Sequence, residues 1–222
     1  MKNAAWYSFL AVSIGEMISL VAHIELLQTI CKPLIIITLI IAYLSTVSSE
    51  ERSRTLLFAL FFSGAGDILL MFPDDKGSFF MMGLIAFLIS HVFYIFTYRQ
   101  HQHDETENRL QGIQKVRLAF PIILSGTGLI FVLYPALGDL KIPVMVYALV
   151  LVVMVLNALL RFGRTTSPSF WMVFSGALLF MFSDSLLAIN KFLEPLAFGS
   201  LWIMATYISA QYLIVKGLIA HK

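Results

Sequence analysis

Eight stretches of mostly apolar residues divide the chain, and each is close to the length that a membrane-spanning helix needs. Such a helix places about 20 residues in the hydrocarbon core, because each residue adds about 1.5 Å along the axis. Since 59% of the residues are hydrophobic and only 13% are charged, a water-soluble globule is excluded. We therefore predict an all-α, polytopic integral membrane protein, a bundle of eight transmembrane helices in a single domain over residues 1–222. The expected spans are 5–23, 33–48, 55–72, 79–98, 118–135, 143–160, 170–190 and 196–216.

Prolines and polar segments mark where the predicted helices begin and end. We expect a polar turn at 74–77 and one solvated loop over 100–117. Proline lacks a backbone N–H and is well tolerated in the first turn of a helix, where that donor would have no partner within the helix. Four prolines are therefore expected at or just before helix starts: Pro33, Pro143, Pro168 and Pro195.

The positive charges between the predicted spans are unevenly distributed. When the loops are assigned alternately to the two sides, one side together with both termini holds 11 of the 15 Lys and Arg residues. The remaining four lie on the other side: Lys32, Lys76, Lys141 and Lys191. Loops rich in Lys and Arg stay in the cytoplasm, so we expect both termini to be cytoplasmic. We expect the membrane to be the bacterial inner membrane.

Composition and motifs exclude several classes of function. The net charge of +2 provides no basic field that would attract nucleic acid. The one cysteine, Cys31, can form neither an intramolecular disulfide nor a metal site built from cysteines. The sequence also lacks a glycine-rich phosphate loop, a G-x-S-x-G motif and an H-E-x-x-H motif, which excludes the common soluble enzyme classes.

Two aspartates, Asp67 and Asp184, lie inside predicted spans. An ionised carboxylate at the centre of a membrane costs about 2.5–3.5 kcal/mol on insertion scales, so an acid there indicates a functional site. Each aspartate lies about 20 Å along its helix from the cytoplasmic side, and this matched depth favours a shared site. Alternatively, each aspartate caps a broken helix or pairs with a lysine, Lys76 or Lys191, to fix the bundle. Glu16 is a third acid in a span, but no matching acid occurs in the fifth span.

The two aspartates also lie in similar local sequences. Residues 63–70 in the third span are similar to residues 182–187 in the seventh span. A repeat of four helices keeps the same orientation in both copies, as in the parallel repeats of some transporters. The similarity therefore suggests a 4+4 parallel repeat.

Polar and aromatic residues follow one face of the fourth span and recur on the eighth. Their spacing of three or four residues is that of one helix face, and we expect this set to line a site: Gly83, Phe87, His91, Tyr94 and Tyr98 on the fourth span, with Tyr207 and Gln211 on the eighth. His91 is the only histidine in the interior of a span, since His23 is the last residue of the first, and such a residue is more often a packing residue than a metal ligand. A zinc site needs three or four protein ligands, so we expect no metal.

Further polar candidates lie toward the predicted outer interface. Lys32 and Lys191 either extend their ammonium groups to water, as interfacial lysines do, or attract a lipid phosphate. Tyr147 is expected at about the depth of the aspartates, and Asn190 at the end of the seventh span. Tyrosine is common at membrane interfaces, so neither of these two residues decides the function alone.

Taken in order, these residues resemble a known family, the YhhN-like lysoplasmalogenases. The resemblance runs from the second to the eighth span, and its motifs are Lys32-Pro33, Gly66-Asp67, Gly83, Phe87, His91, Tyr94, Tyr147, residues 176–180, Ser183-Asp184, Asn190-Lys191-Phe192, Thr206-Tyr207 and Ala210-Gln211. The first span, which contains Glu16, has no counterpart in this pattern.

The resemblance implies an integral membrane hydrolase that cleaves the vinyl ether of lysoplasmalogens without a cofactor. The implied products are a fatty aldehyde and glycerophosphoethanolamine or glycerophosphocholine, so the expected partners are a lysophospholipid substrate and membrane lipids. Asp67 and Asp184 match the family's aspartates, and the reaction needs one acid and one base. Which aspartate takes which role stays open. The expected substrate-binding residues are Lys32, His91, Tyr94, Tyr147, Asn190, Lys191, Tyr207 and Gln211.

Two other classes of function fit some of the same features. A repeat and paired acids that could relay protons are also found in transporters, and in this case the protein would carry or bind a lipid or small molecule. A purely structural membrane protein would keep every activity with asparagine at both aspartates. Release of aldehyde by the purified protein distinguishes an enzyme from both alternatives.

Overall fold

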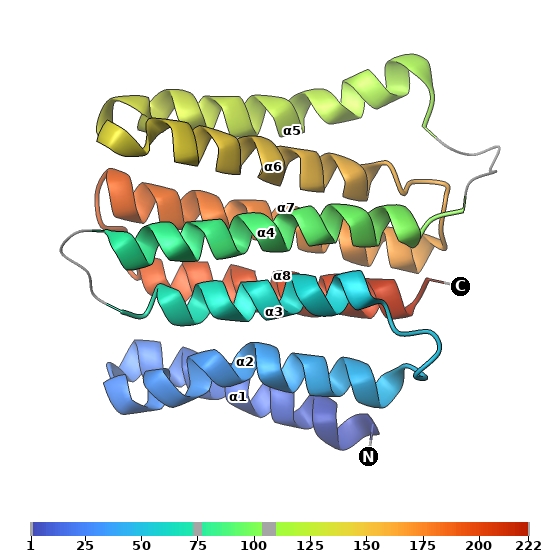
Figure 1. Ribbon diagram of the computed structural model, residues 1–222, viewed down its shortest axis with the longest axis horizontal. Coiled ribbons are helices and arrows are strands. Elements are labelled where there is room, and N and C mark those ends of the chain that lie inside the picture. The colour runs from blue at the N-terminus through green and yellow to red at the C-terminus, as the bar shows by residue number, and fades with distance from the viewer. Residues whose placement is uncertain (1, 73–76, 104–109, 222) are drawn as a thin grey trace. The chain divides into compact units, whose positions relative to one another are not determined.

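The structure is a computed structural model that describes residues 2–72, 77–103 and 110–221. The regular elements of these residues are all helical, and eight α-helices follow one another along the chain (Figure 1). Two short 3₁₀ helices, η1 (Tyr134–Ala136) and η2 (Gly138–Leu140), connect the fifth helix to the sixth. The α-helices are α1 (Lys2–Ala22), α2 (Glu25–Thr46), α3 (Arg54–Leu69), α4 (Ser78–Gln100), α5 (Gly112–Leu133), α6 (Lys141–Leu159), α7 (Ser167–Phe192) and α8 (Gly199–Ile219).

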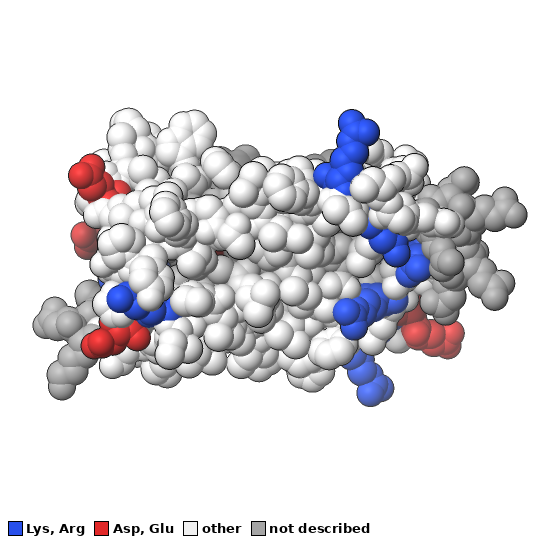
Figure 2. Space-filling model, turned by 90° about the horizontal axis from the view of Figure 1, so that it is seen from above, with Lys and Arg blue, Asp and Glu red and all other residues white. Residues whose placement is uncertain are grey.

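Within the described residues, seven of the eight helices are long and apolar enough to cross a membrane. The exception is α3, whose 16 residues extend only about 24 Å. Figure 2 shows the charged side chains of the drawn face near its two ends, with uncharged side chains across the middle. The prediction of an all-α, polytopic integral membrane protein is therefore confirmed.

Some helix ends differ from the prediction, because a helix can continue beyond its most apolar run. α2 begins at Glu25 and contains Pro33, so the prediction that Pro33 starts a helix is wrong. Proline inside a transmembrane helix is tolerated because neighbouring groups satisfy the freed backbone carbonyl. α5 begins at Gly112, so the loop predicted over 100–117 is shorter than expected. Residues 74–76 of the predicted turn lie outside the described residues.

The chain forms two compact units, Met1–Thr97 and Tyr98–Lys222. In the first unit, α1 packs on α2 and α2 packs on α3. In the second unit, α5 packs on α6, α6 on α7 and α7 on α8. Helices of each unit thus pack in chain order. The 4+4 parallel repeat and the single domain over 1–222 stay predictions.

Hydroxyl groups and aromatic rings join α3 to α4 within the first unit. The hydroxyl oxygens of Ser63 and Ser90 lie 2.7 Å apart, and Ser90 lies within hydrogen-bonding distance, 2.8 Å, of the backbone oxygen of Ala59. The rings of Phe62 and Phe93 stack with their centroids 5.9 Å apart. These contacts hold α3, which carries Asp67, against the predicted site face of α4.

Small residues let α7 and α8 approach each other closely in the second unit. A Cβ atom on Gly176 would lie 3.0 Å from the backbone oxygen of Ala210 and 2.8 Å from Cγ1 of Ile214. A Cβ atom on Gly217 would lie 2.9 Å from the backbone nitrogen of Val173. Packing through small residues is a main source of helix association in membranes, so these glycines fix the helix pair that carries five of the predicted site residues.

We expect Gly176→Ala to destabilise the protein by about 1–3 kcal/mol, because the added methyl group overlaps the backbone of α8. The control is Gly128→Ala in α5, where a Cβ atom would meet no neighbour within 4 Å. Thermal unfolding in detergent should show a clear loss of stability for Gly176→Ala and none for Gly128→Ala. Equal stability of the two variants would contradict the close approach of α7 and α8.

Candidate active site

Tyr147 and Asp184, two of the predicted site residues, are hydrogen-bonded in the second unit. The hydroxyl of Tyr147, on α6, donates to Oδ2 of Asp184, on α7, at 2.5 Å. Both side chains are buried, with 8% and 9% of their surfaces exposed. A hydroxyl that donates to a carboxylate forms a charge-assisted bond, roughly twice as strong as one between neutral groups. The packing of α6 on α7 thus gives a buried carboxyl group a fixed partner.

α8 contributes two buried candidates, Tyr207 and Gln211, one helical turn apart on the same face. Tyr207 packs edge-on against Phe180 of α7, with ring centroids 5.4 Å apart. Ser183, the residue before Asp184, donates to the backbone oxygen of Ile203 at 3.0 Å. These contacts fix α8 against the part of α7 that carries the aspartate.

Asn190 and Lys191 lie at the end of α7, where the chain turns toward α8. Oδ1 of Asn190 accepts a hydrogen bond from the backbone N–H of Leu196 at 2.8 Å. A Cβ atom on Gly199 would lie only 2.5 Å from the same oxygen, so a larger residue at this position would displace the Asn190 side chain. Asn190 therefore stabilises the α7–α8 connection, and Lys191 is exposed beside it. Substrate binding by these two residues stays a prediction.

Asp67 lies near the end of α3, where this helix meets α4, and only 4% of its surface is exposed. A Cβ atom on the preceding residue, Gly66, would lie 2.6 Å from two ring carbons of Phe87. Glycine is therefore required at this contact. His91 and Tyr94 are fully buried on the same face of α4 as Phe87. These residues of α4 thus form a buried face, and their role in binding stays a prediction.

Lys32 and Glu16 lie at the contact between α1 and α2 in the first unit. Lys32 is half-buried inside α2, and Glu16 is fully buried on α1. A Cβ atom on Gly15 would lie 2.9 Å from Sγ of Cys31, so the two helices approach closely at this level. The positive charge of Lys32 interacts electrostatically with the Glu16 carboxyl group.

The predicted site residues are divided between the two units. Four belong to the first unit: Lys32, Asp67, His91 and Tyr94. Six belong to the second: Tyr147, Asp184, Asn190, Lys191, Tyr207 and Gln211. Since the two aspartates belong to different units, their pairing stays a prediction. Among the residues that the structure describes, no three His, Cys, Asp or Glu side chains form a group that could hold a metal ion.

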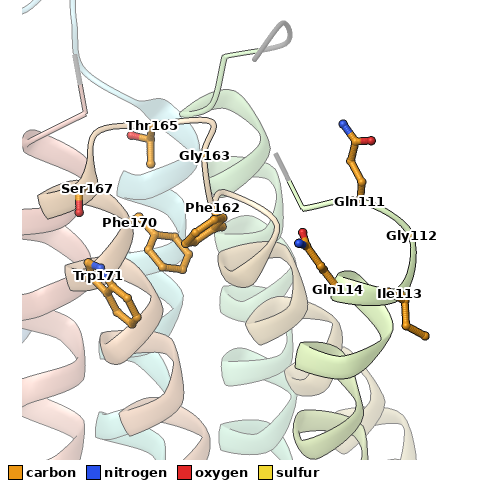
Figure 3. A pocket seen from close by; sticks show the side chains of 10 residues that line it. All are labelled: Gln111, Gly112, Ile113, Gln114, Phe162, Gly163, Thr165, Ser167, Phe170 and Trp171. Carbon is orange, nitrogen blue, oxygen red and sulfur yellow. The ribbon is translucent and has the colours of Figure 1, made fainter. Parts of the chain in front are cut away.

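A cavity of about 960 Å³ opens in the second unit, between the start of α5 and the connection from α6 to α7. Figure 3 shows aromatic rings from the α6–α7 side and amide side chains from the α5 side around it. Its lining residues are Gln111, Gly112, Ile113, Gln114, Phe162, Gly163, Thr165, Ser167, Phe170 and Trp171. None of these described lining residues is titratable.

The sequence pattern of the YhhN family matches residues 27–218. The chain belongs to the YhhN family. The resemblance noted from the sequence is thus confirmed, and the matched range includes all predicted site residues from Lys32 to Gln211. It leaves out all of α1, which carries Glu16, in agreement with the absence of Glu16 from the family motifs.

Relatives of this YhhN-family chain occur in animals and bacteria. The human lysoplasmalogenase TMEM86B is 32% identical over 166 residues, which cover 75% of this chain and 64% of the human protein. The lysoplasmalogenase of Mycobacterium bovis is 32% identical over 197 residues, which cover 86% of this chain and 70% of the relative. The lysoplasmalogenase TMEM86A of Bos taurus is 30% identical over 205 residues, or 90% and 79% of the two chains. No solved structure is significantly similar. These names support the assignment of this chain as an enzyme.

The sequence did not predict a cluster that this YhhN-family chain forms around Arg161, just after α6. Arg161 is fully buried and donates to the backbone oxygen of His101 at 3.1 Å and to Oγ of Ser169 at 2.8 Å. Burial lowers the pKa of Arg161 to about 10, so the side chain stays charged at neutral pH. The guanidinium group therefore ties the end of α4 to the start of α7.

His221, just after α8, completes this cluster. Its Nδ1 lies 2.7 Å from the hydroxyl oxygen of Thr165, and its ring lies 5.6 Å from that of His101 and 5.0 Å from that of His103. Burial, followed by the charges of His101, Arg161 and His103, lowers the pKa of His221 from 6.5 to about 4. His221 is therefore neutral in the folded protein at neutral pH.

We expect the unfolding temperature to fall as the pH is lowered from about 6.5 to about 4. The unfolded chain binds a proton on His221 near pH 6.5, whereas the folded protein does so only near pH 4, so acid favours the unfolded state in this window. In the His221→Gln variant, the unfolding temperature should fall less over this pH range. The control variant, His23→Asn, should show the same fall as the wild type, because His23 lies outside the cluster. Its φ of 54° is one that asparagine tolerates. A His221→Gln variant with the pH dependence of the wild type would contradict this assignment.

Proposed function

We propose that this protein is a lysoplasmalogenase. It hydrolyses the vinyl ether bond of a lysoplasmalogen and releases a fatty aldehyde and glycerophosphoethanolamine or glycerophosphocholine. The observation that carries the proposal is the similarity, at about 30% identity over most of the chain, to proteins named lysoplasmalogenase. The two buried aspartates of the matched range agree with it, because the reaction needs carboxyl groups in two roles.

The first stage of the reaction adds water to the vinyl ether. A carboxylic acid donates its proton to the β carbon, and the electrons of the C=C bond form the new C–H bond. This leaves an oxocarbenium ion, which a neighbouring carboxylate stabilises. The carboxylate then takes a proton from water as the water oxygen bonds to the cationic carbon, and a hemiacetal forms.

The second stage breaks the hemiacetal. Its hydroxyl group returns a proton to the first carboxylate as the bond between the carbon and the glycerol oxygen breaks. The glycerol oxygen takes the proton that the second carboxyl group holds, and the aldehyde leaves. One water molecule is consumed and both carboxyl groups return to their starting states. We assign the two roles to Asp67 and Asp184, one to each.

Polar residues of the family motifs supply substrate binding in this proposal. Lys32 and Lys191 bind the phosphate of the head group, because an ammonium group pairs favourably with a phosphate oxygen. The excess of Lys and Arg on one side supports cytoplasmic termini and a site toward the outer leaflet, and we propose the bacterial inner membrane as the location. The remaining substrate-binding residues are His91, Tyr94, Asn190, Tyr207 and Gln211.

Purified protein in detergent micelles tests the proposed function. A vinyl-ether lysolipid should yield one aldehyde for each glycerophosphoethanolamine or glycerophosphocholine released, whereas the matching alkyl-ether lysolipid, which has no C=C bond, should be inert. We expect the activity to persist in EDTA. The alternative, a transporter, is favoured by the similarity of residues 63–70 to residues 182–187. A protein that moved the intact lysolipid across vesicle membranes without releasing aldehyde would support that alternative.

A further inference from the structure

The hydrogen bond between Tyr147 and Asp184 bears on which aspartate is the acid. The phenol is the donor and Oδ2 of the carboxyl group is the acceptor, with the two oxygens 2.5 Å apart. Bonds from a hydroxyl to an ionised carboxylate are about 2.5–2.7 Å long. The length and direction of this bond fit a phenol that donates to an ionised carboxylate.

The position of the phenol is set by the packing of α6. Tyr147 lies on a buried face with Val144 and Leu151, one turn before and after it. Its ring has few rotatable bonds, and the helix that carries it packs on α7. The hydroxyl can therefore hold the carboxylate plane of Asp184 in one orientation, and such control of geometry is worth up to about 100-fold in rate.

We propose that Tyr147 is a positioning residue that fixes Asp184 as the carboxylate that activates water, which leaves Asp67 as the proton donor to the vinyl carbon. This inference rests on the proposed function. The carboxylate of Asp184 takes a proton from water as the water oxygen bonds to the oxocarbenium carbon. This proton later passes to the departing glycerol oxygen.

Tyr147→Phe tests this role, since it removes the hydroxyl group and keeps the ring. We expect kcat for aldehyde release to fall about 10- to 100-fold and KM to stay within about twofold, because the lost interaction acts on the reaction and not on the head group. The control is Tyr212→Phe on α8, whose ring lies 5.8 Å from Nζ of Lys216 and keeps that contact. A raised KM with unchanged kcat in Tyr147→Phe would make Tyr147 a substrate ligand and overturn the inference.

A second measurement detects the hydrogen bond independently of activity. Thermal unfolding is compared for the wild type, Tyr147→Phe, Asp184→Ala and the double variant. We expect Tyr147→Phe to lower the unfolding temperature of the wild type but to have little effect when Asp184 is already alanine. Additive effects would overturn the role of Tyr147 while leaving the proposed function intact. Absence of aldehyde release by the wild type would instead overturn the proposed function, and the role of Tyr147 with it.

Discussion

Asparagine at Asp67 or at Asp184 is expected to lower kcat for aldehyde release by about 10³-fold or more. General acid and general base catalysis each contribute about 10²- to 10⁴-fold, and an amide can neither donate the required proton nor accept one from water. Because the two groups act as a unit, the double variant should be little worse than either single variant. Asparagine is close to aspartate in size, so the fold should survive.

Kinetics on purified protein, together with thermal unfolding, check this prediction. The control is Asp139→Asn, which changes an exposed acid in the connection between α5 and α6 and should leave kcat unchanged. If either active-site variant kept more than about a tenth of the wild-type kcat while still folded, one aspartate would not be catalytic, and the two-carboxyl reaction would be wrong.

Methionine at Lys32 or Lys191 is expected to raise KM about tenfold or more and to change kcat much less. A hydrogen bond between charged groups contributes about 1.5–3 kcal/mol, and the head group is bound equally in the ground state and the transition state. Methionine keeps the length and the apolar stem of lysine but removes the charge. The effect on KM should shrink at high salt for the exposed Lys191, because salt screens exposed charges.

Lys141→Met is the control for this pair of variants. Lys141 lies on the same predicted side of the membrane, and its Nζ lies 4.7 Å from the ring centroid of Tyr134. It has no place in the proposed binding of the head group, so KM should not change. An unchanged KM in both Lys32→Met and Lys191→Met would remove the phosphate-binding role from these lysines.

The number and order of the helices could be predicted from the sequence because each apolar run is near the thickness of a bilayer. The ends were harder to predict, because polar side chains also occur in helices that extend past the hydrocarbon. Residues from Glu25 to Lys32 are helical although they include four polar side chains, and Pro33 follows within the same helix. The same applies to Gly112 and the next five residues at the start of α5.

The site could be predicted residue by residue but not contact by contact. The depth of Tyr147 along its span marked it as a candidate, yet the hydrogen bond to Asp184 depends on how α6 and α7 pack. The cluster of His101, His103 and His221 was missed for the same reason, because the segments that follow α4 and α8 meet only in the fold. A shared face of one helix, as on α4, could in contrast be predicted from the spacing of its residues, because it does not depend on how helices pack.

The central claim is that the protein cleaves a vinyl ether by protonating its β carbon, and the fate of one hydrogen tests it most directly. The reaction is run in D₂O with purified protein, and the aldehyde is reduced to the alcohol as it forms so that later exchange cannot occur. Protonation at carbon predicts one deuterium on carbon 2 of the alcohol in every turnover. An aldehyde released without deuterium at that carbon, or no enzyme-dependent aldehyde at all, would contradict the claim.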